Sequence, residues 1–161
     1  MSYNPYTPPS SVVADPALPG VIERPQNVTW AVQLMWLGFA LGIAGGAYGL
    51  LFEPVPGVVT RTTLIIVTAI IWAIGFGIAW WIFGALGKGR NWARILTAIV
   101  FCLNVLAVIW MAKVMPGNFQ TWFASASALN VLVYLLQLII YAAAVGLTLT
   151  PSASPWFKQR R

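Results

Sequence analysis

The chain has 161 residues, of which 60% are apolar and only 7% are charged, and its formal net charge is +6. About a quarter of the residues in a soluble domain are charged, so this composition excludes a soluble globule and indicates an integral membrane protein. In so apolar a chain, we assign the positive charge to contact with the phospholipid bilayer and its anionic headgroups, not to nucleic acid.

Residues 1–27 form a proline-rich segment with few large apolar side chains. Proline removes backbone donors and favours extended conformations. Such a segment cannot offset the entropy lost on ordering. We therefore predict a disordered head on the cytoplasmic side, and a partner-binding motif around "NPYTPP" is the alternative.

Four apolar windows follow, each long enough to cross a hydrocarbon core, which takes roughly 20 residues. They cover about 28–52, 63–86, 92–112 and 125–149, and none contains Asp or Glu. We predict an all-α protein whose residues 28–150 form an up-down-up-down transmembrane four-helix bundle. Residues 151–161 are expected to form a basic interfacial tail.

The cations are distributed unequally between the two ends of this bundle. With the N-terminus taken as cytoplasmic, one side carries Arg24, Lys88, Arg90, Arg94, Lys158, Arg160 and Arg161. The other side carries only Arg61 and Lys113. Lys and Arg are enriched in cytoplasmic loops, so both termini are predicted to be cytoplasmic.

The segment "GKGRNWARIL" lies between the second and third spans. Its two glycines permit a tight turn, and Arg90 and Arg94 share a helix face beside Trp92. We interpret it, together with the tail, as a lipid and topology anchor. The alternative is a site for a phosphorylated ligand or an acidic partner loop. The anchor residues are Lys88, Arg90, Trp92, Arg94, Trp156, Lys158, Arg160 and Arg161.

Small residues recur every four positions in the first two spans, as Gly38, Gly42 and Gly46 and as Ala69, Ala73 and Gly77. Small residues at this spacing let two helix backbones approach closely. We predict helix contacts inside the bundle, and a dimer or partner-protein face is the alternative.

Four amides lie at membrane depth: Gln33, Asn104, Asn130 and Gln137. Asn104 and Gln137 fall at similar depths of antiparallel helices, so we predict a hydrogen bond between them, directly or through Asn130. A polar path for a small solute is the alternative interpretation.

The side chains that usually carry catalysis are scarce. The chain has no histidine, a single cysteine (Cys102) and three acids, Asp15, Glu23 and Glu53, all outside the spans. Metal sites need clusters of His, Cys or carboxylates, and proton-coupled transport usually needs an ionisable group inside the membrane. We therefore expect no metal, no cofactor and no enzyme activity.

The segments "NPYTPPSSVVADP", "RPQNVTWAVQLMW" and "GRNWARIL" together resemble small four-span inner-membrane proteins of proteobacteria. These proteins often open with Asn-Pro-Tyr-x-Pro-Pro and carry Gly-Arg-x-Trp-Ala-Arg before the third span. The resemblance covers the head and the starts of the first and third spans. It implies a multi-pass protein of the bacterial inner membrane and carries over no functional residue.

The function predicted from these features is that of a non-catalytic membrane protein that forms a homo-oligomer or is accessory to a larger membrane complex. A small transporter or channel, with a path past Asn104 and Gln137, is one alternative. A lipid-binding, membrane-organising protein that uses Arg90 and Arg94 is another.

Overall fold

The computed structural model describes residues 23–53, 60–114 and 127–158. Its helices are α1 (Gln26–Phe52), α2 (Arg61–Gly87), α3 (Asn91–Val114), α5 (Ala128–Leu149) and the short α6 (Ser154–Lys158). The first four are each long and apolar enough to cross a membrane. The prediction of an all-α protein with four long apolar helices is therefore confirmed, and most of the predicted head lies outside the described residues.

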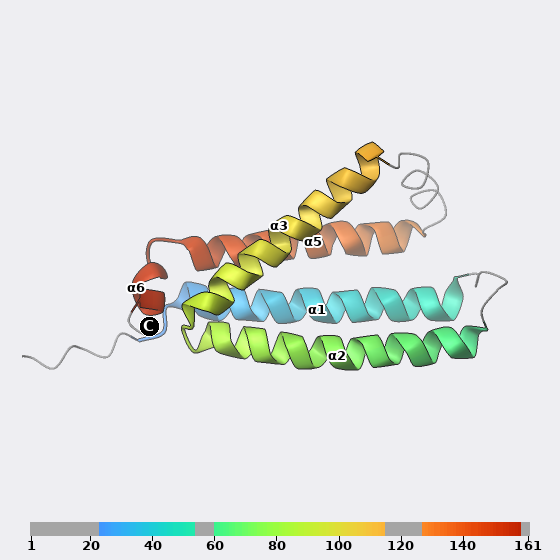
Figure 1. Ribbon diagram of the computed structural model, residues 1–161, viewed down its shortest axis with the longest axis horizontal. Coiled ribbons are helices and arrows are strands. Elements are labelled where there is room, and N and C mark those ends of the chain that lie inside the picture. The colour runs from blue at the N-terminus through green and yellow to red at the C-terminus, as the bar shows by residue number, and fades with distance from the viewer. Residues whose placement is uncertain (1–22, 54–59, 115–126, 159–161) are drawn as a thin grey trace, which may run out of the picture.

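The four long helices run in alternating directions, but they do not form an evenly packed bundle (Figure 1). α1 and α5 lie side by side along most of their length, and α2 packs on the other flank of α1. α3 contacts α2 and α5 and diverges from the other helices toward its C-terminal end (Figure 1). Ala93, in the first turn, is the one residue of α3 that is fully buried.

Glycines of α1 bring it close to α5. A Cβ atom placed on Gly42 would lie 2.6 Å from Nε2 of Gln137. One placed on Gly38 would lie 3.0 Å from the ring of Tyr141. A Cβ at Gly42 would force the Gln137 amide to shift, and one at Gly38 would be tighter against the Tyr141 ring than most real contacts. The small size of glycine therefore lets α1 and α5 approach closely at these positions. We call this α1–α5 contact the glycine seam.

Polar contacts close the glycine seam at both ends. At the start of α1, Asn27 Nδ2 donates to Thr150 Oγ1 at 3.3 Å and to Ser152 Oγ at 3.0 Å. At the other end, the Glu53 carboxylate accepts from Asn130 Nδ2 at 2.6 Å. It also accepts from the backbone N–H of Ser127 at 3.3 Å, just before α5 begins. The carboxylate therefore joins the end of α1 to the start of α5.

The turn between α2 and α3 depends on one glycine. Gly89 has φ of 76°, its N–H donates to the Leu86 carbonyl, and the Arg90 N–H donates to the Ala85 carbonyl. This hydrogen-bond pattern and the left-handed glycine define a Schellman C-cap. The indole of Trp156, from α6, lies against Gly89, so that a Cβ there would be 2.7 Å from Nε1. Gly89 thus provides both the turn and the room for α6.

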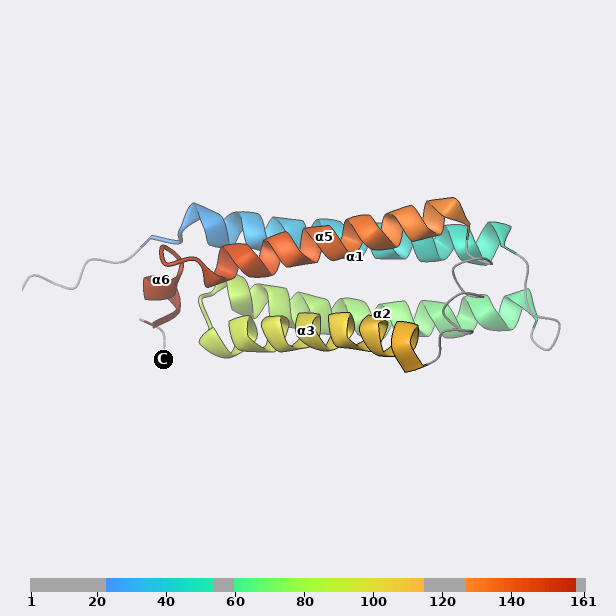
Figure 2. The same cartoon turned by 90° about the horizontal axis from the view of Figure 1, so that it is seen from above.

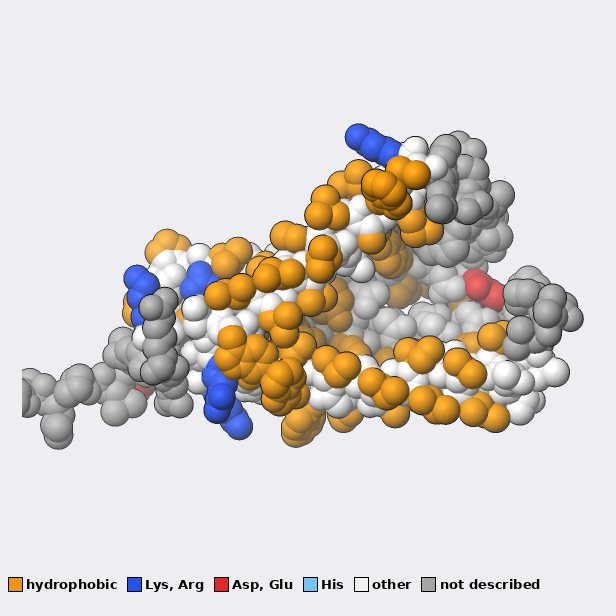
Figure 3. All heavy atoms as spheres, viewed as in Figure 1, with side chains coloured by type: hydrophobic (Ala, Val, Ile, Leu, Met, Phe, Trp, Pro, Cys, Tyr) orange, Lys and Arg blue, Asp and Glu red, His pale blue; other side chains and the backbone are white. Residues whose placement is uncertain are grey.

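Apolar side chains cover the flanks of the helices, and most Lys and Arg side chains gather at the end of the bundle near α6 (Figure 3). Exposed Ile, Leu, Phe and Trp side chains run along α2 and α3. Backbone groups inside these helices are satisfied within each helix, as a hydrocarbon environment requires. The protein is therefore a multi-pass membrane protein.

Candidate functional site

A cavity of about 290 Å³ lies between α2, α3 and α5. We call it the membrane cavity. Its walls come from three helices, which contribute Ile82 and Phe83 (α2), Thr97, Val100, Phe101 and Asn104 (α3), and Tyr134, Gln137, Leu138, Tyr141 and Val145 (α5). Two of its lining residues, Gln137 and Tyr141, are also the residues of α5 that contact Gly42 and Gly38 in the glycine seam.

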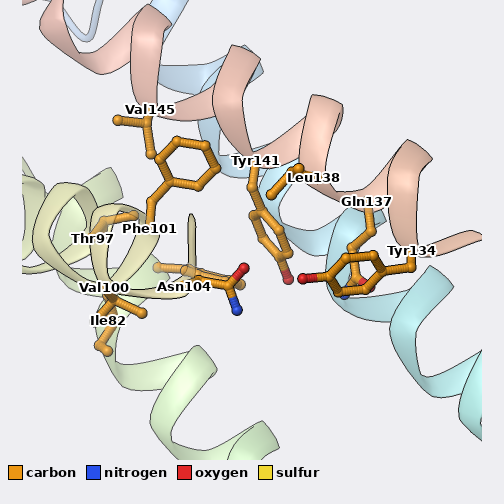
Figure 4. A pocket seen from close by; sticks show the side chains of 11 residues that line it. Ile82, Thr97, Val100, Phe101, Asn104, Tyr134, Gln137, Leu138, Tyr141 and Val145 are labelled. Atoms are coloured by element: carbon orange, nitrogen blue, oxygen red, sulfur yellow. The ribbon is translucent and has the colours of Figure 1, made fainter. Parts of the chain in front are cut away.

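The polar side chains of the membrane cavity lie together. The Tyr134 and Tyr141 hydroxyls point toward one another beside Gln137, and Asn104 faces them from α3 (Figure 4). The Tyr141 hydroxyl and the Gln137 side chain are hydrogen-bonded. Gln137 also lies directly against Gly42 of α1. The glycine seam therefore fixes where Gln137 and Tyr141 present their polar groups.

The remaining walls are apolar. Val100 and Phe101 of α3 face Val145 and Leu138 of α5, with Ile82 on the α2 side (Figure 4). A concave apolar space with a few convergent polar groups is the usual form of a small-molecule site. The membrane cavity can hold an apolar body and hydrogen-bond a single polar group.

The sequence interpretation missed the two tyrosines. Tyr134, Gln137 and Tyr141 are spaced i, i+3 and i+7, so they share one face of α5. In a span otherwise rich in Leu, Ile and Ala, this spacing of polar groups is the signal that predicts a polar face. The prediction from the sequence names the amides and omits the two hydroxyl groups beside them.

The predicted amide network is only partly formed. Asn104 and Gln137 do line the same cavity, but Gln137 is bonded to Tyr141. The predicted link through Asn130 is wrong, because Asn130, in the first turn of α5, donates a hydrogen bond to the Glu53 carboxylate. Gln33 lies exposed on α1. Counting residues along the helices correctly brought Asn104 and Gln137 to one cavity, whereas helix rotation and the position of Glu53 decided the partners of Gln137 and Asn130.

The predicted anchor residues divide into two groups. Lys88, Arg90 and Lys158 are exposed at the basic end, and the partly exposed Trp92 ring stacks on Trp81 with centroids 4.7 Å apart. Arg160 and Arg161 lie outside the described residues.

The prediction for Trp156 requires a correction, and Arg94 has a contact within the protein. Trp156 is only 7% exposed, because it packs over Gly89 and not among lipid headgroups. Its neighbour Phe157 is 1% exposed and carries the Arg94 guanidinium 5.3 Å above its ring. α6 therefore folds under the α2–α3 turn as part of the core.

The two small-residue series differ in their surroundings. Gly38 and Gly42 face α5, and a Cβ on Gly46 would lie 2.8 Å from the Trp72 ring of α2. The prediction of an internal contact does not hold for the series on α2, whose members Ala69, Ala73 and Gly77 are exposed. A Cβ on Gly77 would meet no atom within 4 Å.

No family model matches the chain, and no solved structure matches it. The chain is similar to a probable metalloreductase, AIM14, of Clavispora lusitaniae, with 32% identity over 79 residues. The match covers 49% of this chain and 15% of that protein. The chain thus matches a small part of the length of this relative.

This similarity contradicts the expectation that the protein is not an enzyme, because the related protein is named as one. The expectation depended on missing His, Cys and carboxylate clusters. Within the described segments, no group of three or more such residues is assembled. The absence of such clusters bears on metal sites and acid–base catalysis, and not on sites built from hydroxyl and amide groups, such as the membrane cavity.

Proposed function

We propose that the protein binds an amphipathic molecule of the bilayer in the membrane cavity. The observation that carries this proposal is the combination of an apolar space with clustered polar groups from Asn104, Tyr134, Gln137 and Tyr141. A water-soluble solute would leave the apolar walls unmatched. A plain hydrocarbon would form no hydrogen bond with the polar side chains that gather at this place.

The orientation of the ligand follows from the lining. Its polar group lies between Asn104 and the tyrosines, and its apolar part lies against Val100 and Phe101. Entry from the membrane is supported by the exposure of α3 along this stretch, where both Val100 and Asn104 are exposed. The ligand therefore reaches the site laterally, without crossing an aqueous loop.

Photocrosslinking with a diazirine-bearing fatty acid tests the proposal. We expect the label on α3 around Val100–Asn104 and on α5 around Tyr134–Tyr141. Val100→Trp, which fills the cavity, is expected to reduce that labelling. Leu103→Trp, at an equally exposed position of the same helix that does not line the cavity, is the matched control. Equal labelling of the two variants, or label spread evenly over all four long helices, contradicts the proposal.

A second candidate function, supported by the similarity to the probable metalloreductase, is electron transfer to a metal ion. A quinol fits both the similarity and the cavity, because its oxygens can hydrogen-bond to Asn104 and to the tyrosines while its tail lies among apolar walls. One quinol would give two electrons to two ferric ions and release two protons, leaving a quinone. The chain has no histidine, so this candidate uses the quinol itself as the electron carrier.

Ferric chelate reduction by the purified protein with decylquinol tests this second candidate. We expect a rate above the uncatalysed background that Val100→Trp abolishes and Leu103→Trp leaves unchanged. A background rate from the wild-type protein would exclude the quinol reaction and leave the amphiphile-binding proposal standing on the crosslinking result.

Association with itself or with a larger complex has lost its main support, because the α1 glycines are occupied by α5 and α2.

We retain as a proposal that the protein resides in a bacterial inner membrane with both termini in the cytoplasm, supported by the clustering of cations at one end. A C-terminal fusion to alkaline phosphatase should be inactive, and an active fusion would contradict this orientation.

A further inference from the structure

A second concave site lies between α1 and α2, at the end of the bundle where most Lys and Arg side chains gather, and it shares the lining residue Phe83 with the membrane cavity. It has a volume of about 330 Å³. Its mouth carries Arg24, just before α1, and Lys88, which caps the end of α2. Its walls include Trp36, Trp80 and Phe83, and Gly84 lies along it. We call it the basic groove.

The charges of the basic groove favour an anion. The Arg24 guanidinium lies against Gly87, since a Cβ atom added to that glycine would be 3.4 Å from its nitrogens. Lys88 is the next residue, at the C-terminal end of α2. Within the described segments no acidic side chain lines the groove. Glu23 is exposed next to Arg24 in the chain. Arg24 and Lys88 therefore place two cations on the lining of one opening.

The walls of the basic groove favour an apolar chain attached to that anion. Trp36 packs against Trp80 and Phe83 with ring centroids 5.9 and 5.2 Å apart. Trp80 lies eight residues before Lys88 on α2, which corresponds to about 12 Å along the helix. The lining of the groove thus extends from the two cations to aromatic side chains farther along α2. A free phosphate would use only its mouth.

We infer that the basic groove is a binding site for one anionic phospholipid, with its phosphate between Arg24 and Lys88 and an acyl chain against Trp36 and Trp80. Basic pockets between membrane helices bind anionic headgroups by this chemistry. The site is separate from the proposed ligand in the membrane cavity, and it is also distinct from a general attraction of surface cations to the bilayer.

Native mass spectrometry of the full chain, released from bilayers of equal parts phosphatidylglycerol and phosphatidylcholine, tests this inference. We expect one retained phosphatidylglycerol per chain in preference to phosphatidylcholine. Arg24→Gln and Lys88→Gln should each lower that preference about fivefold. Lys113→Gln, which removes one cation at the other end of the bundle, is the charge-matched control and should change nothing.

A second pair of variants tests the groove without altering charge. Neither Gly84 nor Gly77 has an atom within 4 Å of an added Cβ, and they lie on the same face of α2, two turns apart. Gly84→Leu fills the groove and should lower lipid retention, whereas Gly77→Leu should not. Because both positions are open, neither substitution is expected to prevent folding.

Three results would overturn the inference. Equal retention of the two lipids would exclude a headgroup-specific site. An equal effect of Lys113→Gln and Lys88→Gln would show bulk charge attraction only. Displacement of the retained lipid by inorganic phosphate, together with full retention in Gly84→Leu, would show that the mouth binds a phosphate and that the groove holds no acyl chain.

Discussion

The glycine seam and the α3 side of the bundle are two opposite ways of packing a membrane helix. Along the seam, α1 and α5 approach until a Cβ on Gly42 would overlap the Gln137 amide, and polar contacts close both ends. α3, in contrast, buries a single residue and diverges. α5, which packs closely on α1, forms one wall of the membrane cavity, and α3 forms the facing wall.

The comparison shows that similar sequence patterns have different structural meanings. α1 and α2 both carry small residues every four positions, yet Gly42 is in contact with α5 while Gly77 is open. In a membrane, small residues stabilise a helix pair only where a partner packs onto them, because lipid offers no hydrophobic drive for association. The α1 glycines are needed for packing, and the α2 series is not.

The largest effect is expected from breaking the glycine seam. Gly42→Leu forces a branched side chain into the position of the Gln137 amide and should lower the free energy of unfolding by about 3 kcal/mol. SDS titration in mixed micelles measures this loss. Gly77→Leu is the matched control, and an equal loss from both variants would contradict the role assigned to the seam.

A smaller loss is expected at the end of the seam. Glu53→Ala removes the acceptor of Asn130 and of the Ser127 N–H and should cost about 1–2 kcal/mol of unfolding free energy. The same titration applies. Glu23→Ala, at an exposed position, should leave the unfolding free energy unchanged. Equal losses from Glu53→Ala and Glu23→Ala would show that Glu53 does not join α1 to α5.

Substitution of a glycine that has no neighbouring atoms should raise the free energy of unfolding instead of lowering it. Gly77→Ala adds a methyl group where no atom lies within 4 Å, and it should stabilise the helix by up to about 1 kcal/mol because alanine loses less backbone entropy. Gly42→Ala should destabilise. The same unfolding titration measures both variants. A change of the same sign in both would contradict the difference assigned to Gly42 and Gly77.

The smallest effect is expected on α3. Leu103 is 59% exposed, so Leu103→Ala should change the unfolding free energy by less than about 0.5 kcal/mol. Hydrogen exchange should show faster exchange in the C-terminal half of α3 than in the middle of α1, because few contacts hold that half in place. Equal protection of the two segments would mean that α3 is packed as firmly as the seam.

Composition and periodicity predicted the number of long helices, their approximate bounds and the membrane environment. These properties follow from local physics, since an apolar window of sufficient length must be helical to satisfy its backbone in lipid. The same information predicted that Asn104 and Gln137 lie at one depth, because depth depends only on the rise per residue.

The rotation of each helix about its axis, and the distance between helices, were decided by the tertiary structure alone. Rotation determines that Gln137 meets Tyr141, that Asn130 meets Glu53, and that the α2 small residues face outward. Trp156 was expected among lipid headgroups and is buried, because the open surface of Gly89 accepts its ring. In chains so uniformly apolar, lipid-facing and protein-facing side chains are chemically alike, so only the packing of one helix on another determines which residues form a site.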